Sequence, residues 1–209
     1  MTTTCDILGP IQLVTASTGS VLTLAEVKQH VRVEGSFVDD DSLLTNLIAV
    51  ATRYVEHEIY GARQLLTATY DVLVREWWDC LDLPRPPLQS VTSVKYYDTS
   101  GTQQTVASST YIVTVPMRLP GSIDLAPLAV WPTYQAGRAY PITVRFVCGY
   151  GASTAVPQLV KQALLVAIGE LYNSREAGVL GVSAGGSSLS STMSAVRWLL
   201  EADGWGSYQ

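Results

Sequence analysis

Residue types that could perform catalysis or bind a metal are few in this chain, and their spacing does not favour such chemistry. There are two histidines. His30 follows Glu26 by four residues, which is the spacing of a surface pair on a helix. His57 lies between Glu56 and Glu58, without the H-E-x-x-H spacing that places two imidazoles on one helix face. Neither histidine is predicted to be a metal ligand.

The acidic triplet Asp39-Asp40-Asp41 could attract a cation, but it lacks the alternating oxygen ligands and the central glycine of a calcium loop. Capping of the helix that follows explains the triplet better, because acidic groups in a first helical turn complement the helix dipole. We therefore predict no metal site at the triplet.

Other signatures of enzymes are missing from the sequence. It contains no G-x-S-x-G elbow, P-loop or G-x-G-x-x-G motif. Gly181–Gly186 is rich in glycine, yet it follows a predicted helix instead of a strand. Cys5, Cys80 and Cys148 are odd in number and widely spaced, which favours reduced thiols over disulfides or a zinc site. We predict no catalytic, cofactor-binding or metal-binding residues, and we expect that the protein is not an enzyme.

Aromatic residues are the remaining candidates for ligand binding, since the chain has five tryptophans and eleven tyrosines. Trp77-Trp78 and Trp131-Pro132 could form a sugar-binding platform, or they could close the ends of a small β core, which is the commoner role. The first role would make the protein a carbohydrate- or cell-surface-binding module. This alternative stays open at the level of sequence.

The composition is that of a globular protein. The 209 residues are 47% hydrophobic and 15% charged. The longest apolar run, around Leu164–Ile168, is far shorter than the roughly 18 residues of a membrane span. The N-terminal segment MTTTCDILGP lacks the basic and apolar regions of a signal peptide. We expect synthesis in the cytosol and no membrane segment.

Charge is distributed unevenly along the chain. The net charge is −5, and residues 1–62 carry three basic and eight acidic side chains, whereas the remainder is balanced. Proteins that grip nucleic acid need clustered lysine and arginine to displace counterions from phosphates. The distribution therefore argues against nucleic-acid binding, but it allows the protein to stand beside DNA without holding it.

Two helices are predicted in the N-terminal part. Thr23-Leu24-Ala25-Glu26 has the pattern of a capping box, and the short helix that it begins should end at Gly35 and Ser36. A longer helix should begin at Asp39–Ser42 and end before Gly61. Its apolar stripe consists of Leu43, Leu44, Leu47, Ile48, Ala51, Tyr54, Val55 and Ile59.

From Leu65 the apolar period changes from 3.6 to 2, which predicts an antiparallel β-rich subdomain over residues 65–154. The expected strands are Thr69–Val74, Val91–Tyr97, Gln103–Val106, Tyr111–Val115, Ser122–Leu125 and Ile142–Cys148. Pro84, Pro86 and Pro87 precede the second strand, and proline favours an edge strand because it lacks an N–H donor.

Pro157 suits the first position of a third, central buried helix that runs to about Tyr172. The segment GVLGVSAGGSSLSSTMS that follows has the composition of a flexible linker, and Ala195–Glu201 should form a helix of about two turns. The predicted fold class is α+β. A discontinuous core of three main helices comes from residues 1–64 and 155–176, with the β-rich insertion at 65–154 and a flexible arm at 177–209.

Several of these segments occur in a characteristic order. They are LTLAEVKQHVRVE, DSLLTNLIAVATRYVEHEIYGARQL after an acidic loop, LPRPPLQSVTSVKYYDTSG, VRFVCGYGASTAVPQLVKQALLVAIGELYNSRE and a short C-terminal helix. Over about residues 20–200 the chain resembles the head–tail connector family of tailed bacteriophages, also called adaptor or head-completion proteins and found in prophages and gene transfer agents.

The resemblance implies a structural, non-enzymatic protein. Twelve copies would form a ring beneath the portal protein that extends the DNA channel towards the tail, with DNA passing through the lumen without specific binding. The implied partners are the portal, other copies of the chain, and a tail-side connector, stopper or tail-terminator protein. The implied location is the neck of the virion. A C-terminal arm would dock onto the portal, and its candidate contacts are Trp198, Leu199, Leu200, Trp205 and Tyr208.

Two further surfaces are candidates for contacts in such a ring. Acidic side chains that could face the lumen or an adjacent subunit are Asp39, Asp40, Asp41, Glu56 and Glu58, although a solvated helix end explains them equally well. The hairpin that could meet a neighbouring subunit contains Pro84, Pro86, Pro87, Tyr96, Tyr97, Asp98 and Gly101.

Overall fold

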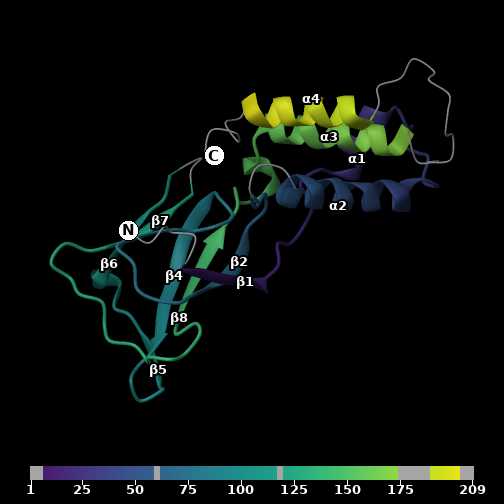
Figure 1. Cartoon of the computed structure of the whole chain (residues 1–209). Helices are drawn as coiled ribbons and strands as arrows, with labels where there is room; N and C mark the ends of the chain where they lie inside the picture. Colours follow the sequence, from purple (N-terminus) through teal and green to yellow (C-terminus); the bar gives the residue numbers. More distant parts are fainter. Residues whose placement is uncertain (1–6, 59–61, 117–119, 174–188, 203–209) are drawn as a thin grey trace. The chain divides into compact units, whose positions relative to one another are not determined.

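The computed structural model describes residues 7–58, 62–116, 120–173 and 189–202 (Figure 1). The chain forms two compact units, and each of them combines two separate stretches of sequence. Residues 1–18 and 66–150 form what we call the β unit, and residues 19–65 and 151–209 form the helical unit. The structure thus contains both helices and antiparallel sheets, which confirms the α+β class.

The larger sheet of the β unit has five antiparallel strands in the order β1-β2-β8-β4-β5. These strands are β1 (Leu8–Thr15), β2 (Ala68–Val74), β8 (Ile142–Cys148), β4 (Leu88–Tyr97) and β5 (Gln103–Thr105). The second sheet has the order β3-β7-β6, from β3 (Cys80–Asp82), β7 (Ser122–Leu125) and β6 (Tyr111–Thr114). Short 3-10 turns, η2 and η3, cover Ser108–Thr110 and Ser153–Ala155.

All six predicted strands are present, and β7 and β8 have the predicted bounds. Buried and partly exposed residues alternate along β2 and β8, so that one face of the sheet carries the core. That face includes Tyr70, Val72, Val144 and Phe146. The chain leaves β8 through Gly149, whose φ is +111° and where a Cβ would lie 2.4 Å from the carbonyl oxygen of Leu66. Only glycine fits this close approach.

β1 and β3 are the strands that sequence reasoning missed. β1 is an edge strand whose side chains are mostly exposed, so its sequence carries no strict alternation. It also places residues 7–18 in the β unit, whereas the sequence assigned them to the helical core. β3 has three residues and is defined by its pairing with β7, between Leu81 and Ile123. Such a strand has too few residues to show a period.

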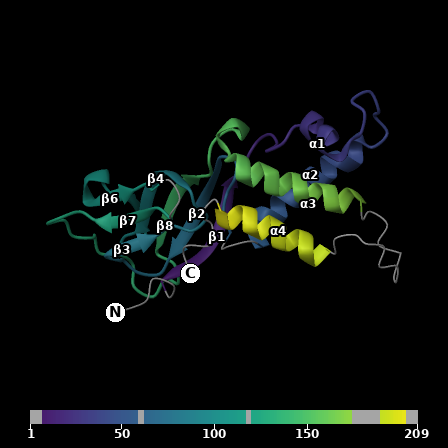
Figure 2. The same ribbon diagram turned by 90° about the horizontal axis from the view of Figure 1, so that it is seen from above.

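The helical unit contains α1 (Leu24–Val31), α2 (Asp41–Glu58), α3 (Gln158–Asn173) and α4 (Leu189–Ala202), as Figure 2 shows. The predicted capping box of α1 is present. The backbone N–H of Thr23 donates to the Glu26 carboxylate at 2.6 Å, and the N–H of Glu26 donates to the Thr23 hydroxyl at 3.2 Å. α1 ends at Val31, earlier than the expected stop at Gly35, because Arg32 adopts the left-handed conformation with φ of 60°.

The prediction of three main helices needs correction, since α4 is a fourth with 14 residues. The sequence predicted about two turns there and assigned Leu189–Ser194 to a linker. α4 packs against α3 and buries Val196 and Leu200 completely. This tertiary contact outweighs the modest helix propensity of the serine and threonine residues. The remainder of the predicted linker, residues 174–188, lies outside the described part of the chain.

Candidate assembly surfaces

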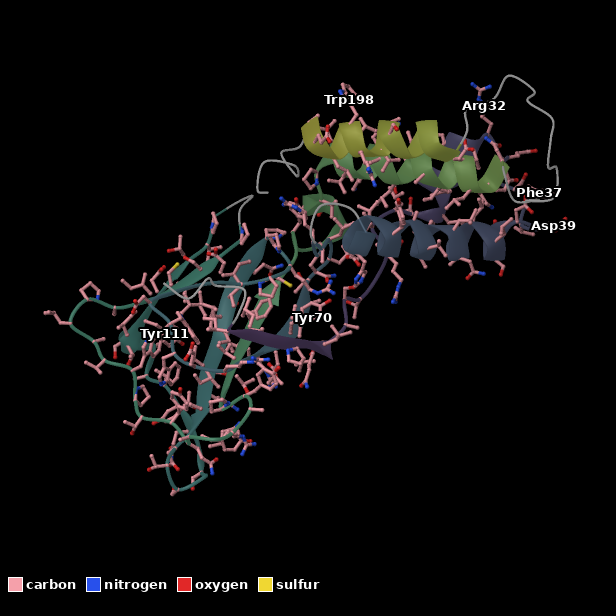
Figure 3. All side chains as sticks on the ribbon, viewed as in Figure 1. Arg32, Phe37, Asp39, Tyr70, Tyr111 and Trp198 are labelled. Atoms are coloured by element: carbon pink, nitrogen blue, oxygen red, sulfur yellow. The ribbon has the colours of Figure 1, made fainter. Side chains whose placement is uncertain are left out.

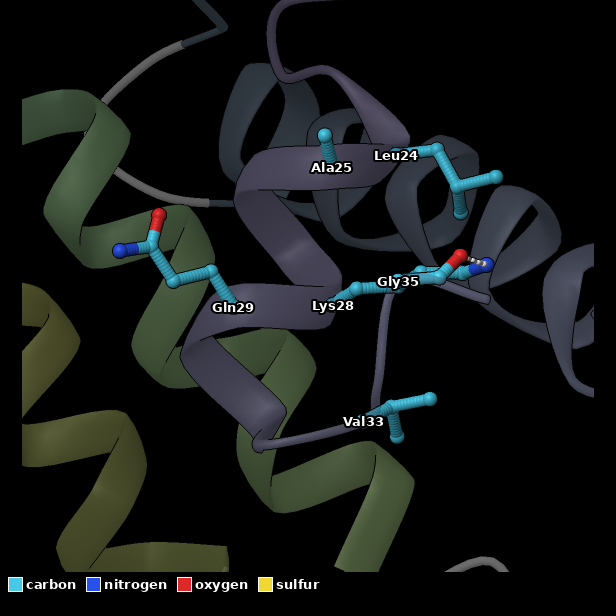
Figure 4. Close-up of a pocket in the computed structure, with 6 residues that line it drawn as sticks. All are labelled: Leu24, Ala25, Lys28, Gln29, Val33 and Gly35. Carbon is cyan, nitrogen blue, oxygen red and sulfur yellow. Dashed lines mark hydrogen bonds between the residues drawn. The ribbon is translucent and has the colours of Figure 1, made fainter. Parts of the chain in front are cut away.

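The loop between α1 and α2, residues 32–40, is held by one buried lysine. Lys28 is 5% exposed, and its Nζ donates to the carbonyl oxygens of Phe37 at 2.7 Å and Gly35 at 3.3 Å. The same Nζ lies 2.5 Å from a carboxylate oxygen of Asp41. Figure 4 shows Lys28 with Leu24, Ala25, Gln29, Val33 and Gly35, which line a pocket of about 580 Å³. The lysine therefore fixes the backbone of the loop.

Three of the five acidic residues singled out in the sequence have partners inside the helical unit. Asp40 accepts a hydrogen bond from the Tyr172 hydroxyl, and Asp41 pairs with Lys28. The Glu56 carboxylate accepts from the backbone N–H of Leu65 at 2.9 Å and also from the Gln64 amide. These contacts give Asp40, Asp41 and Glu56 structural roles, which their positions in the sequence did not reveal.

Asp39 differs from these acids because it is exposed and its side chain makes no hydrogen bond or ion pair with another described residue. It points outward at the same end of the helical unit as Phe37 (Figure 3). Phe37 and Val38 are 43% and 64% exposed. The exposed apolar side chains of Phe37 and Val38 thus lie next to the unpaired Asp39 carboxylate, on a loop whose backbone Lys28 holds in place. The side chain of Glu58 lies outside what the structure describes.

The C-terminal helix exposes one of its predicted portal contacts and buries another. Trp198 is 67% exposed and points away from α3 (Figure 3), whereas Leu200 is fully buried. Leu199 is half-buried. Leu200 therefore contributes to packing within the unit and has no surface to offer a partner. Trp205 and Tyr208 lie outside the described residues.

The predicted hairpin between β4 and β5 is present, with Lys95 opposite Thr105 and Tyr97 opposite Gln103. Its turn is organised by Asp98, whose carboxylate accepts from the Ser100 hydroxyl, the Gln104 amide, and the backbone N–H groups of Thr102 and Ser100. These hydrogen bonds, with the Ser100 hydroxyl contributing most, lower the pKa of Asp98 to about 2. The Asp98 carboxylate is therefore ionised at neutral pH and can accept these hydrogen bonds across the turn.

The proline segment before β4 lies inside the β unit. Pro86 and Pro87 are buried, and the Pro87 carbonyl accepts the N–H of Gly149 at 2.8 Å. β4 is also not an edge strand over its full length, because it pairs with β8 along Leu88–Tyr96 and with β5 near its end. The stiff segment therefore shapes the unit itself. Within the predicted hairpin surface, this burial leaves Pro86 and Pro87 little area for a subunit contact.

Trp77, Trp78 and Trp131 form a cluster in the β unit. Their rings pack on one another, and their N–H groups already have acceptors. Trp77 and Trp131 stack at 4.5 Å between centroids and 4° between planes. All three indole N–H groups donate to backbone carbonyls: Trp77 to Pro132, Trp78 to Ile123 and Trp131 to Trp78. A sugar-binding platform needs free ring faces. The arrangement supports the alternative in which these rings close the β core.

The described ranges contain neither a cluster of metal-ligand side chains nor a membrane-spanning helix. No group of three or more His, Cys, Asp or Glu side chains is gathered there in a way that could hold a metal ion. None of the helices in the same ranges combines the length and the apolar character that crossing a membrane requires.

Comparison with known proteins finds similarity to one family over part of the chain. Residues 21–113, which include α1, α2 and the β4–β5 hairpin, match the family of phage gp6-like head-tail connector proteins. This match confirms the resemblance that the order of the sequence segments predicts. No curated protein matches the chain.

Solved structures of gene transfer agent particles contain chains with a similar fold. The neck of an empty GTA particle computed with C6 symmetry gives a TM-score of 0.68 at 24% identity, covering 90% of this chain and 95% of that chain. The virion of a native gene transfer agent particle gives 0.67 at 23% identity, covering 91% and 95%. The neck of a native GTA particle computed with C12 symmetry gives 0.60 at 20% identity, covering 90% and 95%.

Proposed function

We propose that this protein is a head–tail connector, a structural component of the neck of a phage-like particle. The observation that carries the proposal is the family match over residues 21–113. The fold supports it, because necks of gene transfer agent particles contain chains with the same architecture along nearly their whole length. In this role the chain works by protein–protein contact and catalyses no reaction.

The proposal assigns the protein to a ring of identical copies between the portal and a tail-side connector, stopper or tail terminator. The lumen of the ring would extend the DNA channel. The excess of acid in residues 1–62 suits a wall that must release DNA, since like charges repel phosphate. Because Asp40, Asp41 and Glu56 have internal partners, Asp39 is the member of the five candidate acids whose described side chain is left to face the lumen or an adjacent subunit.

Attachment to the portal is assigned to α4 and the residues that follow it. Trp198 supplies a large exposed aromatic surface, which is the residue type that dominates interface hot spots. Leu199, Trp205 and Tyr208 complete the proposed contact. The carbohydrate-binding alternative has no specific observation in its favour, because the tryptophan faces stack on one another.

The experiment mixes the purified protein with the portal protein of the same particle and images the product by electron microscopy. We expect collars of this chain on one end of the portal ring. Trp198→Ala should weaken attachment about tenfold or more, the loss expected of a hot-spot aromatic side chain. Val50→Ala, which truncates a 55% exposed side chain on α2, is the matched control and should attach normally. Failure of the wild-type chain to bind any portal would overturn the proposal.

A further inference from the structure

A pocket in the β unit, separate from the one beside Lys28, has both aromatic and basic lining residues. It has a volume of about 560 Å³. Its described lining residues include Arg75, Trp77, Trp131, Ala136 and Arg138. No acidic side chain is among these described lining residues. The pocket therefore combines an apolar wall with positive charge.

Both arginines of this pocket are positioned by tyrosine rings. The guanidinium of Arg138 lies 3.5 Å from the centroid of the Tyr97 ring. Arg75 lies 5.5 Å from the centroid of the Tyr140 ring and donates to its hydroxyl at 3.4 Å. Arg138 is exposed and has no carboxylate partner within the described part of the chain. A stacked guanidinium without an anion favours a ligand that brings a carboxylate.

The aromatic wall adds a second requirement on the occupant. Trp77 and Trp131 form a stacked pair whose N–H groups already donate to backbone carbonyls. The wall can therefore offer apolar contact but few new hydrogen bonds. The chemistry of the pocket suits a short protein segment that carries exposed apolar side chains next to an acidic one.

The α1–α2 loop of the helical unit has that composition. Phe37 and Val38 are substantially exposed, and Asp39 follows them with an unpaired carboxylate. The Nζ of Lys28 fixes the carbonyl of Phe37, so the loop presents these side chains from a constrained backbone. A preorganised loop loses less conformational entropy when it binds.

We propose that Phe37, Val38 and Asp39 of one copy dock into the basic aromatic pocket of the next copy, with Asp39 paired to Arg138. The proposal rests on the proposed function, which requires repeated contacts between identical chains. Every copy carries both surfaces, and they are unlike one another. Contact between unlike surfaces is heterologous, and such contacts generate closed rings when the rotation between copies closes. The carboxylate of the loop and the arginines of the pocket attract each other, whereas a basic segment would be repelled from the pocket.

The first test is a charge exchange. Asp39→Arg and Arg138→Glu should each weaken self-association about tenfold or more, because each creates a like-charge contact at the interface. The double variant should recover to within about fivefold of the wild type, since the pair is restored with reversed sign while Arg75 stays positive. Analytical ultracentrifugation and electron microscopy of rings, free and on the portal, supply the measurement. Arg53→Glu alters an exposed charge on α2, outside this loop, and should leave association unchanged.

The second test is cross-linking between copies, which also detects weak contacts. Val38→Cys and Ala136→Cys variants are mixed and treated with a short bifunctional maleimide. A cross-linked dimer should form in this mixture and not when Val50→Cys replaces Val38→Cys. Wild-type chains treated with the same reagent show how much cross-linking comes from the natural cysteines.

The outcomes separate the contact from the function. Rings that tolerate both charge reversals, or a mixture that gives no specific cross-link, would overturn this contact and leave the connector role intact. Loss of portal attachment with normal self-association would assign the pocket to the portal and equally overturn it. A wild-type chain that neither self-associates nor binds the portal would contradict the connector role itself.

Discussion

Lys28 is a single side chain on which the geometry of a whole loop depends. Its ammonium group satisfies two backbone carbonyls and pairs with Asp41 while being almost completely buried. A buried cation is stable only when it is paired and fully hydrogen-bonded. In sequence the residue is one of three ordinary lysines, so nothing but the fold reveals this role.

Replacing this lysine should be costly. Lys28→Met leaves the carbonyls of Gly35 and Phe37 without their donor and the Asp41 carboxylate without its cation. We expect the free energy of unfolding to fall by about 2–4 kcal/mol, measured by urea denaturation. Adding Asp41→Asn should recover part of the loss. Arg53→Met removes an exposed cation on α2 and should change stability by less than about 0.5 kcal/mol. An equal effect of both single variants would contradict the role of Lys28.

Asp98 gives the hairpin turn a defined response to acid. Its pKa is lowered from 3.8 to about 2, first by the Ser100 hydroxyl. Because the folded-state pKa is depressed, the contribution of the carboxylate to the turn is complete above the ordinary value and is lost as pH falls towards about 2. A carbon-detected NMR titration of the carboxylate should show this pKa. Ser100→Ala should raise it towards 3.8, whereas Thr99→Ala, at an exposed neighbour, should not.

At the scale of elements, the end of β8 is a point where the fold requires glycine. Gly149→Ala would place a Cβ 2.4 Å from the carbonyl oxygen of Leu66 at a φ of +111°. We expect a loss of about 2–4 kcal/mol, because both the steric contact and the backbone conformation disfavour alanine. Gly35→Ala, where a Cβ meets nothing within 4 Å, is the control and should be neutral. Thermal unfolding of the two variants makes the comparison.

The same elements show what sequence can predict about this fold. The capping box of α1 and the bounds of β7 and β8 follow from local chemistry and from the alternation of buried residues, so they were predictable. β1 was missed because a strand exposed on most of its length has no alternating pattern. α4 was underestimated because its first turns depend on packing against α3, a contact distant in sequence.

The candidate surfaces show the same division. Exposed aromatic residues at α4 could be inferred from composition, whereas the burial of Leu200 beside the exposed Trp198 follows from which helical face meets α3. The basic aromatic pocket was not foreseen. Arg75 and Arg138 are far apart in sequence, and their acidic and small sequence neighbours do not indicate that both line one pocket. Only the β unit as folded brings them to one site.

For the whole molecule, the division into two units predicts that a core substitution destabilises mainly the unit that carries it. Val144 in the β unit and Leu164 in the helical unit are both fully buried. Each change to alanine should lower stability by roughly 1–4 kcal/mol through lost apolar contact and a cavity. Hydrogen exchange should show the lost protection mainly within the unit that carries the substitution. Equal loss across both units for either variant would contradict independent cores.

The polypeptide crosses between its two units three times, at residues 18–19, 65–66 and 150–151. A load that pulls one unit from the other is therefore divided among three covalent backbone paths that act in parallel. Cutting any one of them leaves two, so no single proteolytic nick can release one unit from the other. This connectivity gives the subunit a mechanical redundancy that two domains joined by one linker would lack.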